Sequence, residues 1–500
     1  MGKFDWKNLD DDELELVLED SLDENVMEDV VAQVTPCKWV MAFILIGMAL
    51  RTFTFDFFNL NYILPFAGII ISLIGYRRLK NENMWFWFDY IFIWLRAVYT
   101  LFLLIMNTVI IHSSGYMVSF MNVLGGVFIG VSFAEVACLW LGIRAVQKKA
   151  GLEPKAYSAG ILLGCEVVLT YLALIKYRGS LLMLAFVGVY VLLFYNMHKL
   201  SKELDVAGYA ISTKRVRIPD SFIAIVLAVV LIVGCTCGYI FGNRYYMDWT
   251  VEKSAYAGND AGGGIADTEN SSTTSDILRI AQNLIEQGFP EYVIMDLKAE
   301  EIAECDGALR VVTNVEENEY GLEFTDVAVR IPDEAEKWVI FHHYRWTIDK
   351  KFYGTELVQV WTTYRDNPRG WAAAGDIGVS GRILYDKDGV TYTSQYRSLE
   401  TQTYRSDNIF YGSRTLTDIF GTFSFPVRGQ NCRGYVMYSA VHIDTSCVFT
   451  SFLNYTHQQS LRQYPVKTAY ESRTTSWFEH RTFRTIQNYW FMYNTMENEE

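Results

Sequence analysis

The sequence predicts a polytopic α-helical membrane bundle of about seven spans, followed by an extracytoplasmic α+β domain that is mainly an antiparallel β-sandwich or jelly roll. Apolar stretches of spanning length crowd the chain between Cys37 and Gly242. Lys and Arg are concentrated in alternate loops between these stretches. From Ala308 onward, apolar and polar residues alternate as they do in strands. Hydrocarbon admits only helices and closed barrels, so the first observation indicates a helical bundle.

These patterns divide the chain into five parts. We expect an acidic cytoplasmic tail at 1–36, a seven-helix transmembrane bundle at 37–242, a flexible linker at 243–275, a short helical hairpin at 276–307, and a β-rich extracytoplasmic domain with a C-terminal helix at 308–500.

The N-terminal tail is strongly acidic, since residues 1–35 hold 12 acids against Lys3 and Lys7. Apolar residues in the stretch from Leu9 to Val34 have helical spacing and predict two short amphipathic helices separated near Ser21. Two interpretations stay open. The tail is either a docking segment for a basic partner or a solvated segment repelled by anionic lipid.

The distribution of basic residues predicts the orientation of the spans. The expected spans are 38–55, 60–76, 88–111, 119–143, 157–176, 180–198 and 221–242. The loops after the second, fourth and sixth spans carry 12 Lys and Arg residues, whereas the opposite loops hold only Arg51, Lys176 and Arg178. Under the positive-inside rule this bias predicts a multi-pass plasma-membrane protein with a cytoplasmic N-terminus and an extracytoplasmic C-terminal domain.

Four ionisable residues fall in or beside the expected spans: Arg96, Glu135, Glu166 and Asp89. A charge at the bilayer centre costs about 2.5–3.5 kcal/mol on insertion scales, so such residues usually face the bundle interior and pair. Their depths permit a pair between Arg96 and either Glu135 or Glu166. The cluster is either part of an ion or proton pathway or a structural clamp between helices.

Glycines spaced four residues apart predict close helix packing. The candidates are Gly126, Gly130, Gly160, Gly164, Gly234, Gly238 and Gly242. Packing within the bundle is one interpretation, and a homodimer contact along the last span is the other.

Short strands separated by turn residues predict the β-rich domain. The expected strands are 308–316, 321–331, 337–348, 355–364, 380–386, 389–396, 434–443 and 447–455. Asp388-Gly389 predicts a hairpin turn, because glycine supplies the positive φ that the turn needs. A stripe of apolar residues over 476–493 predicts the C-terminal helix.

Repeated Tyr-Arg pairs are the main binding signal in this domain. The ligand-binding candidates are Tyr364, Arg365, Tyr396, Arg397, Tyr404 and Arg405, with Trp361 and Trp371 as added aromatic surface. Arginine beside aromatic residues favours an anionic polymer, a glycan or a protein ligand. The same pairs also arise on strands when one residue faces the core and the next faces water.

Other chemistry has little support in the sequence. No polybasic stripe indicates nucleic acid, and no HxH, HExxH or CxxC pattern indicates a metal. We therefore expect no cofactor and no metal. No GxSxG is present, and the histidines form no motif, so an enzyme is a minor alternative. The pairing of Cys432 with Cys447 stays open.

Two segments resemble a known group. LNYILPFAGIIISLIGYRRLKNENMWF, Leu60–Phe86, and GFPEYVIMDLKAEEIAECDGA, Gly288–Ala308, are similar to uncharacterised multi-pass membrane proteins of Gram-positive bacteria. The resemblance implies a bacterial plasma-membrane setting with an outward domain, and it brings no activity, cofactor or catalytic residue.

We therefore expect a bacterial envelope membrane protein whose outer β-domain binds a ligand, polymer or protein partner, with a signal passing to the acidic tail as one option. The first alternative is a transporter or ion-pathway component that uses the intramembrane charges. The second is an envelope hydrolase. The lipid bilayer is the one partner that the composition itself implies.

Overall fold

The computed structural model describes residues 34–55, 57–110, 115–175, 177, 179–212, 218–252, 271–362, 371–373, 379–408, 412–442, 450–475 and 482–491. The chain divides into two compact units. The helical unit comprises Met1–Asn107 and Ile111–Cys237, and the β-rich unit comprises Thr108–Ile110 and Gly238–Glu500. The predicted acidic tail helices and most of the predicted linker lie outside the described residues.

Long apolar helices form the helical unit. In chain order they are α2 (Cys37–Thr52), α3 (Leu60–Leu79), α4 (Met84–Met106), α5 (Gly115–Lys149), α6 (Tyr157–Leu174), α7 (Ser180–Val206) and α8 (Asp220–Phe241). Among the described residues, six helices, α3 to α8, are long and apolar enough to cross a membrane. Helix α2 has 16 residues and rises about 24 Å. The seventh crossing therefore stays a prediction.

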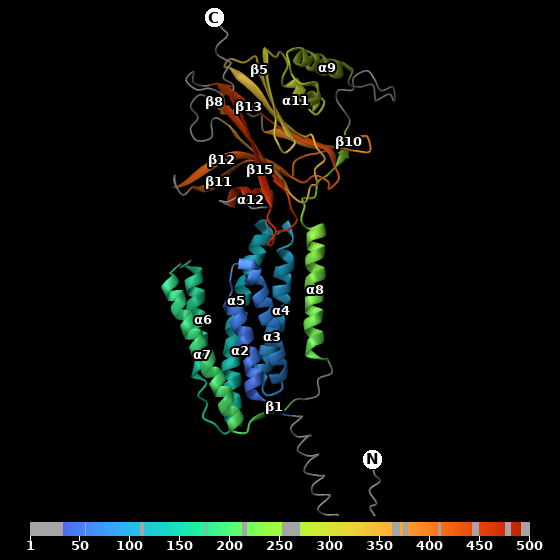
Figure 1. Ribbon diagram of the computed structural model, residues 1–500. Coiled ribbons are helices and arrows are strands. Elements are labelled where there is room, and N and C mark those ends of the chain that lie inside the picture. The colour runs from blue at the N-terminus through green and yellow to red at the C-terminus, as the bar shows by residue number, and fades with distance from the viewer. Residues whose placement is uncertain are drawn as a thin grey trace, which may run out of the picture. The chain divides into compact units, whose positions relative to one another are not determined.

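Helices α2 and α3 are the most closely packed pair of this unit. A Cβ atom on Gly47 of α2 would lie 2.5 Å from the carbonyl oxygen of Gly68 in α3. One on Gly75 would lie 2.6 Å from Cγ1 of Ile44. Glycine thus allows the two backbones to approach. Helices α2 to α5 stand side by side, and the α6–α7 hairpin packs against α2 and α5 (Figure 1).

Polar contacts fix one end of the helical unit. Strand β1 (Val34–Pro36) pairs with β2 (Ala210–Ser212). Asp205 of α7 accepts hydrogen bonds from the backbone N–H groups of Cys37 at 2.6 Å and Lys38 at 3.1 Å. Those donors belong to the first turn of α2, where a helix leaves backbone N–H groups unpaired.

Two antiparallel sheets build the β-rich unit. The large sheet runs β3-β10-β9-β13-β6-β5-β4, with β8 also on β13, and the small sheet runs β11-β12-β7-β14-β15. The strands are β3 (Thr250–Val251), β4 (Arg310–Glu317), β5 (Leu322–Ile331), β6 (Lys337–Trp346), β7 (Glu356–Thr362), β8 (Trp371–Ala373), β9 (Ser380–Lys387), β10 (Val390–Ser394), β11 (Ser398–Asn408), β12 (Gly412–Phe423), β13 (Gln430–His442), β14 (Thr450–Gln458) and β15 (Phe483–Phe491).

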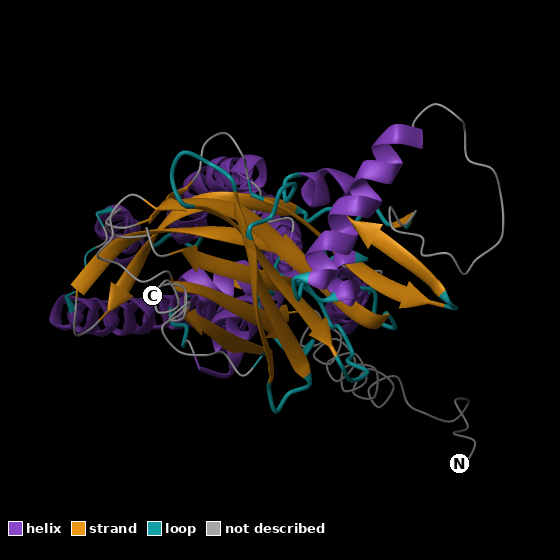
Figure 2. Ribbon diagram, turned by 90° about the horizontal axis from the view of Figure 1, so that it is seen from above, coloured by secondary structure: helices purple, strands orange, loops and turns teal. Residues whose placement is uncertain are grey.

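The two sheets share one apolar core. Trp338 and Tyr344 from the large sheet meet Val360 and Tyr455 from the small sheet in this core. Short helices cover the other face of the large sheet, and they are α9 (Ser271–Glu286), α10 (Glu291–Ile294) and α11 (Ala299–Ala303). Helix α12 (Ala469–Thr475) packs on the other face of the small sheet. Figure 2 shows the strands of the two sheets from above.

The predicted hairpin turn at Asp388-Gly389 is confirmed. Both residues have positive φ, 53° and 77°, and Lys387 pairs with Val390 across the turn. The predicted C-terminal helix is wrong, because Phe483–Phe491 forms β15 on β14. Ile486, Asn488 and Trp490 are buried, whereas Gln487 and Tyr489 between them are exposed, so the burial has the period of a strand. A spacing of four residues puts side chains on one face in a strand as well as in a helix.

The start of the predicted linker belongs to the β-rich unit. Met247 joins the core between the sheets, and Tyr245 and Trp249 pack against it. Thr250–Val251 forms β3, which pairs with β10 at the edge of the large sheet. Asn243 Nδ2 also donates to the carbonyl of Tyr353 at 3.0 Å. The large side chains at the start of this segment pack into the core, which the Gly- and Ser-rich composition of the predicted linker did not indicate.

Candidate functional site

Glu135 of α5 lies between two arginines of other helices. Arg51, in the last turn of α2, donates to its carboxylate from Nη2 at 2.6 Å and from Nη1 at 3.2 Å. Arg96 of α4 donates to it from Nε at 3.0 Å, and from Nη2 to Ser132 Oγ at 2.5 Å. The pairing of Arg96 with Glu135 is one of the two that the sequence allowed. Arg51, which the sequence placed among the loop charges, is the second partner of Glu135.

A cavity of about 180 Å³ opens beside this cluster. Helices α2, α4, α5, α6 and α7 all contribute to its lining. Besides the two arginines and Glu135, the lining includes Glu166 of α6 and Tyr190 of α7. The hydroxyl of Tyr190 donates to Glu166 Oε1 at 3.1 Å. The structure thus gathers three of the four predicted intramembrane residues, Arg96, Glu135 and Glu166, around one cavity.

Asp89, the fourth predicted intramembrane residue, is separate from this lining. It lies in the second turn of α4 and is fully buried. Within the described residues, neither of its carboxylate oxygens has a hydrogen-bond partner. It lies within electrostatic range of Glu135 and Arg51. Burying a carboxyl group without a hydrogen-bond donor costs free energy of folding. The structure gives Asp89 no contact that explains this cost.

The predicted packing glycines have different surroundings. Cβ atoms on Gly234, Gly238 and Gly242 of the last apolar segment would lie 2.4 Å from Ile105 Cδ1, 1.8 Å from Thr108 Oγ1 and 2.7 Å from Val109 Cγ1. One on Gly160 would lie 3.2 Å from the ring of Trp140. A Cβ atom on Gly126, Gly130 or Gly164 would have no neighbouring heavy atom within 4 Å among the described residues.

The structure describes the side chains of only three of the predicted ligand-binding candidates, Trp361, Tyr396 and Arg397. Tyr364 and Arg365 lie outside the described residues, and the side chains of Tyr404, Arg405 and Trp371 are likewise not described. Trp361 is half-buried against Phe452, with ring centroids 5.3 Å apart. Arg345, from the pair Tyr344-Arg345, binds Glu323 at 2.9 Å.

Tyr396 and Arg397 line a cavity of about 470 Å³ in the β-rich unit. Tyr396 is buried, and its hydroxyl lies 2.9 Å from the Tyr344 hydroxyl and donates to the Tyr435 carbonyl at 3.0 Å. It therefore fixes the wall of the cavity. Arg397 is exposed beside it. This pair lies between β10 and β11, with Tyr396 buried and Arg397 exposed.

The rest of this cavity combines aromatic, apolar and polar residues. One side comes from the segment after α8, and the other from the end of β10 and the residues after it. Tyr246 is 86% exposed on the first side. The other polar lining residues of the cavity are Asp248, Thr250, Arg382, Thr393, Ser394 and Gln395. Because β3 pairs with β10, the two sides are held together by backbone hydrogen bonds. An exposed aromatic ring with amides and hydroxyls suits a polar ligand.

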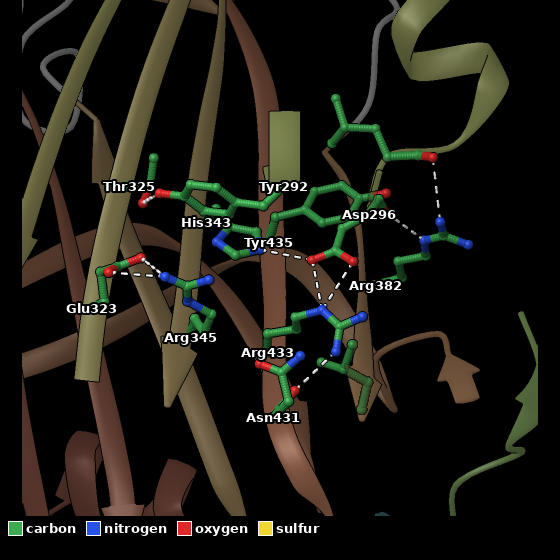
Figure 3. Close-up of polar contacts among 12 residues, drawn as sticks. Tyr292, Asp296, Glu323, Thr325, His343, Arg345, Arg382, Asn431, Arg433 and Tyr435 are labelled. Atoms are coloured by element: carbon green, nitrogen blue, oxygen red, sulfur yellow. Dashed lines mark hydrogen bonds and ion pairs between the residues drawn. The ribbon is translucent and has the colours of Figure 1, made fainter. Parts of the chain in front are cut away.

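A second buried charge cluster joins the short helices α9 to α11, the helical layer of the β-rich unit, to the large sheet (Figure 3). Asp296, after α10, is 3% exposed and accepts from Arg433 Nε at 2.9 Å on both oxygens. His343 Nε2 lies 2.9 Å from its Oδ2. Burial raises the pKa of Asp296, but the hydrogen bond with His343 and the charge of Arg433 outweigh it and hold that pKa below 3.8. Arg382 Nε donates to the Asp296 carbonyl at 2.8 Å.

A Ser-His-Asp arrangement spans the core between the sheets. His342 Nδ1 lies 2.6 Å from Asp326 Oδ1, and His342 Nε2 lies 2.7 Å from Ser451 Oγ. Tyr438 contacts the same Ser451 oxygen at 2.6 Å, and Asn488 donates to Asp326 at 2.7 Å. This order of groups is that of a nucleophile, base and orienting acid. However, all three members are 0% exposed, so no substrate reaches Ser451 in this conformation.

The adjacent histidines His342 and His343 lie on different faces of the large sheet. His342 and His343 follow one another in β6, so their rings face opposite sides of the large sheet. Across the residues that the structure describes, no group of three His, Cys, Asp or Glu side chains could hold a metal ion. Cys432 is a buried free thiol whose pKa is raised by burial, and Cys447 lies outside the described residues.

Comparison with known proteins adds no family. No protein-family model matches the chain, and no curated protein matches it. The resemblance to uncharacterised membrane proteins of Gram-positive bacteria therefore stays an expectation.

Proposed function

We propose that this chain is a bacterial envelope protein whose β-rich unit binds a polar glycan or an anionic polymer in the cavity lined by Tyr246 and Arg397. The observation that carries the proposal is this cavity of about 470 Å³, which lies at one of the predicted Tyr-Arg pairs. Ligand sites are usually preformed concave regions with a few polar groups that fix orientation.

The chemistry of the lining favours this ligand class. The phenol ring of Tyr246 offers a flat face against which a sugar ring or a chain of CH groups packs. Thr250, Thr393 and Gln395 supply hydroxyl and amide groups that both donate and accept. Arg397 supplies a planar cation that suits phosphate or carboxylate groups along a polymer.

The membrane topology is part of the proposal. We propose that α2 is the first of seven crossings, which places the N-terminus in the cytoplasm and the β-rich unit outside the plasma membrane. Support comes from the 12 Lys and Arg residues in alternate loops. Arg51 strengthens the bias, because it pairs with Glu135 in the helical unit and is not a loop charge. We also propose that the two facing sheets form a β-sandwich.

The hydrolase alternative has weaker support. It would use Ser451, His342 and Asp326, which are buried between the sheets. A well-placed nucleophile accelerates a reaction only if the substrate can reach it, and Ser451 is not accessible. The arrangement is better explained as a hydrogen-bonded link between the large and small sheets, in which each buried polar group finds a partner.

Binding to the full-length protein in lipid nanodiscs tests the proposal. We expect saturable binding of either chitohexaose, a neutral glycan, or polyglycerol phosphate, an anionic polymer. Arg397→Ala should weaken polymer binding by about 10-fold, since a charge-assisted hydrogen bond contributes about 1.5–3 kcal/mol. Tyr246→Ala should weaken either ligand by loss of ring contact.

Arg279→Ala is the matched control, because Arg279 is an exposed arginine of the same unit that pairs with Asp306 on the helical layer. It should bind as the unmodified protein does. Absence of binding to both probes, or equal losses in Arg279→Ala and Arg397→Ala, would contradict the proposed site.

A further inference from the structure

We propose that the cavity in the helical unit is a binding site for a small oxyanion, a phosphate or carboxylate group, held by Arg51 and Arg96. This inference is independent of the proposed function, since it concerns the helical unit alone. It rests on the cavity of about 180 Å³ and on the excess of hydrogen-bond donors over acceptors around Glu135 in its wall.

Hydrogen-bond donors exceed acceptors around Glu135. Each guanidinium group carries five N–H donors and no acceptor. Arg51 makes two hydrogen bonds to Glu135, and Arg96 makes one to Glu135 and one to Ser132. Arg51 Nε is buried and has no partner among the described residues. Buried donors in native proteins nearly always have an acceptor. A ligand with several oxygen atoms would supply acceptors for the arginines at this cavity.

The guanidinium groups of the wall suit an anion. Their side chains are 12% and 19% exposed, and both bind the carboxylate of Glu135. The cavity greatly exceeds the roughly 10–15 Å³ that one water molecule needs. Planar guanidinium groups are well suited to bidentate contacts with phosphate or carboxylate oxygens.

Glu166 gives the site a second, opposing charge. It lines the same cavity, and the Tyr190 hydroxyl satisfies one of its oxygens at 3.1 Å. A carboxylate there repels an anion, so neutralising Glu166 should strengthen oxyanion binding. A cation or proton site would respond in the opposite direction. The sign of this effect separates the oxyanion site from the ion pathway that the sequence left open.

The experiment measures the melting temperature of the full-length protein in phosphatidylcholine nanodiscs. Inorganic phosphate and acetate are added against chloride at equal ionic strength. A ligand that binds only the folded state raises the melting temperature in a concentration-dependent way. We expect a rise with phosphate or acetate that exceeds that with chloride. A second arm replaces part of the lipid with phosphatidylglycerol and distinguishes a lipid headgroup from a free anion as the source.

Variants then assign the effect to the cavity. Arg96→Gln should raise the concentration of phosphate needed for half of the shift by about 10- to 100-fold. Glu166→Gln should lower it. The control is Arg78→Gln, because Arg78 of α3 pairs with Asp220 at 3.2 Å and does not line the cavity. We expect this variant to keep the unmodified response to phosphate.

Three results would overturn the proposal. One is an equal response to phosphate, acetate and chloride in both lipid compositions. Another is weaker oxyanion binding in Glu166→Gln, which would indicate a cation site. The third is a change in Arg78→Gln as large as that in Arg96→Gln, which would place the effect outside the cavity. If Arg96→Gln does not fold, Glu166→Gln still decides the sign.

Discussion

The two units each hold a buried carboxylate beside cationic groups, and the two clusters differ in the partners of their arginines and in the space beside them. Asp296 in the β-rich unit receives hydrogen bonds from Arg433 and lies 2.9 Å from His343. Glu135 in the helical unit receives them from Arg51 and Arg96, with a cavity beside the two arginines. Both clusters are therefore buried pairs of arginine and carboxylate, but only the one at Glu135 is described with a cavity beside its arginines.

The difference lies in the partners of the arginines. Arg433 also binds Asp386 at 3.0 Å, so its donors are shared between two carboxylates. The guanidinium groups around Glu135 have no second carboxylate within ion-pair distance in the described part of the helical unit. An arginine shared between two carboxylates holds elements together, whereas arginines beside a cavity are placed to bind a ligand. We assign a structural role to the Asp296 cluster and a binding role to the Glu135 cluster.

Removing Glu135 should have the largest effect on stability. Glu135→Gln leaves two buried arginines without a counter-charge, and breaking a buried ion pair in this way costs about 3–5 kcal/mol. We expect most of the protein to be lost from the folded, monodisperse fraction in detergent. Glu153→Gln, which alters an exposed pair with Lys155, should leave that fraction unchanged. Normal folding of Glu135→Gln would show that the arginines do not depend on it.

Asp296→Asn should destabilise the β-rich unit by about 1.5–3 kcal/mol near neutral pH, because it loses charge-assisted hydrogen bonds. The pKa of Asp296 is lower in the folded than in the unfolded chain. Its contribution is therefore present above the unfolded pKa of about 3.9 and is lost as the pH falls through the folded value.

Unfolding of the unmodified protein and of Asp296→Asn, followed by tryptophan fluorescence from neutral pH downward, checks this dependence. The gap in stability between the two proteins should stay constant at neutral pH and narrow below about pH 4. A gap that is the same across the whole range would mean that the charge of Asp296 contributes nothing.

Ser451→Ala should cost about 1–2 kcal/mol, since His342 Nε2 loses its partner in a fully buried place. The unmodified protein should not react with a fluorophosphonate probe, because Ser451 is 0% exposed. Labelling that depends on Ser451 would instead revive the hydrolase alternative. Thermal unfolding and gel-based labelling give the two readouts.

Glycine substitutions should have the smallest effects and the clearest contrast. Gly126→Ala meets no atom within 4 Å and should be neutral or stabilising by up to about 1 kcal/mol through helix propensity. Gly47→Ala brings a Cβ to 2.5 Å from the Gly68 carbonyl and should destabilise the helical unit. Equal melting temperatures for the two variants would contradict the close packing of α2 and α3.

The sequence predicted the features that depend on local pattern. Apolar length located the helices from α3 to α8, and the Asp388-Gly389 turn fixed one hairpin. The cost of charge in hydrocarbon correctly drew attention to Arg96 and Glu135, which the structure brings to 3.0 Å. These predictions needed no knowledge of tertiary contacts.

Features that depend on distant partners could not be predicted. Arg51 interrupts an apolar stretch, and only the contact with α5 shows that it is buried. Strands β11 and β12 are polar over much of their length, and their pairing in the small sheet defines them. Phe483 and Ile486 pack into different cores on opposite faces of β15, which a helical stripe would have placed together.

The most direct test compares the two clusters in one measurement. Arg96→Gln and Arg433→Gln each remove an arginine from a buried carboxylate, and both should lower the melting temperature of the full-length protein in nanodiscs. The account predicts that the rise with added phosphate is lost in Arg96→Gln and kept in Arg433→Gln. A rise that is kept in both variants, or lost in both, would contradict the assignment of binding to the helical unit.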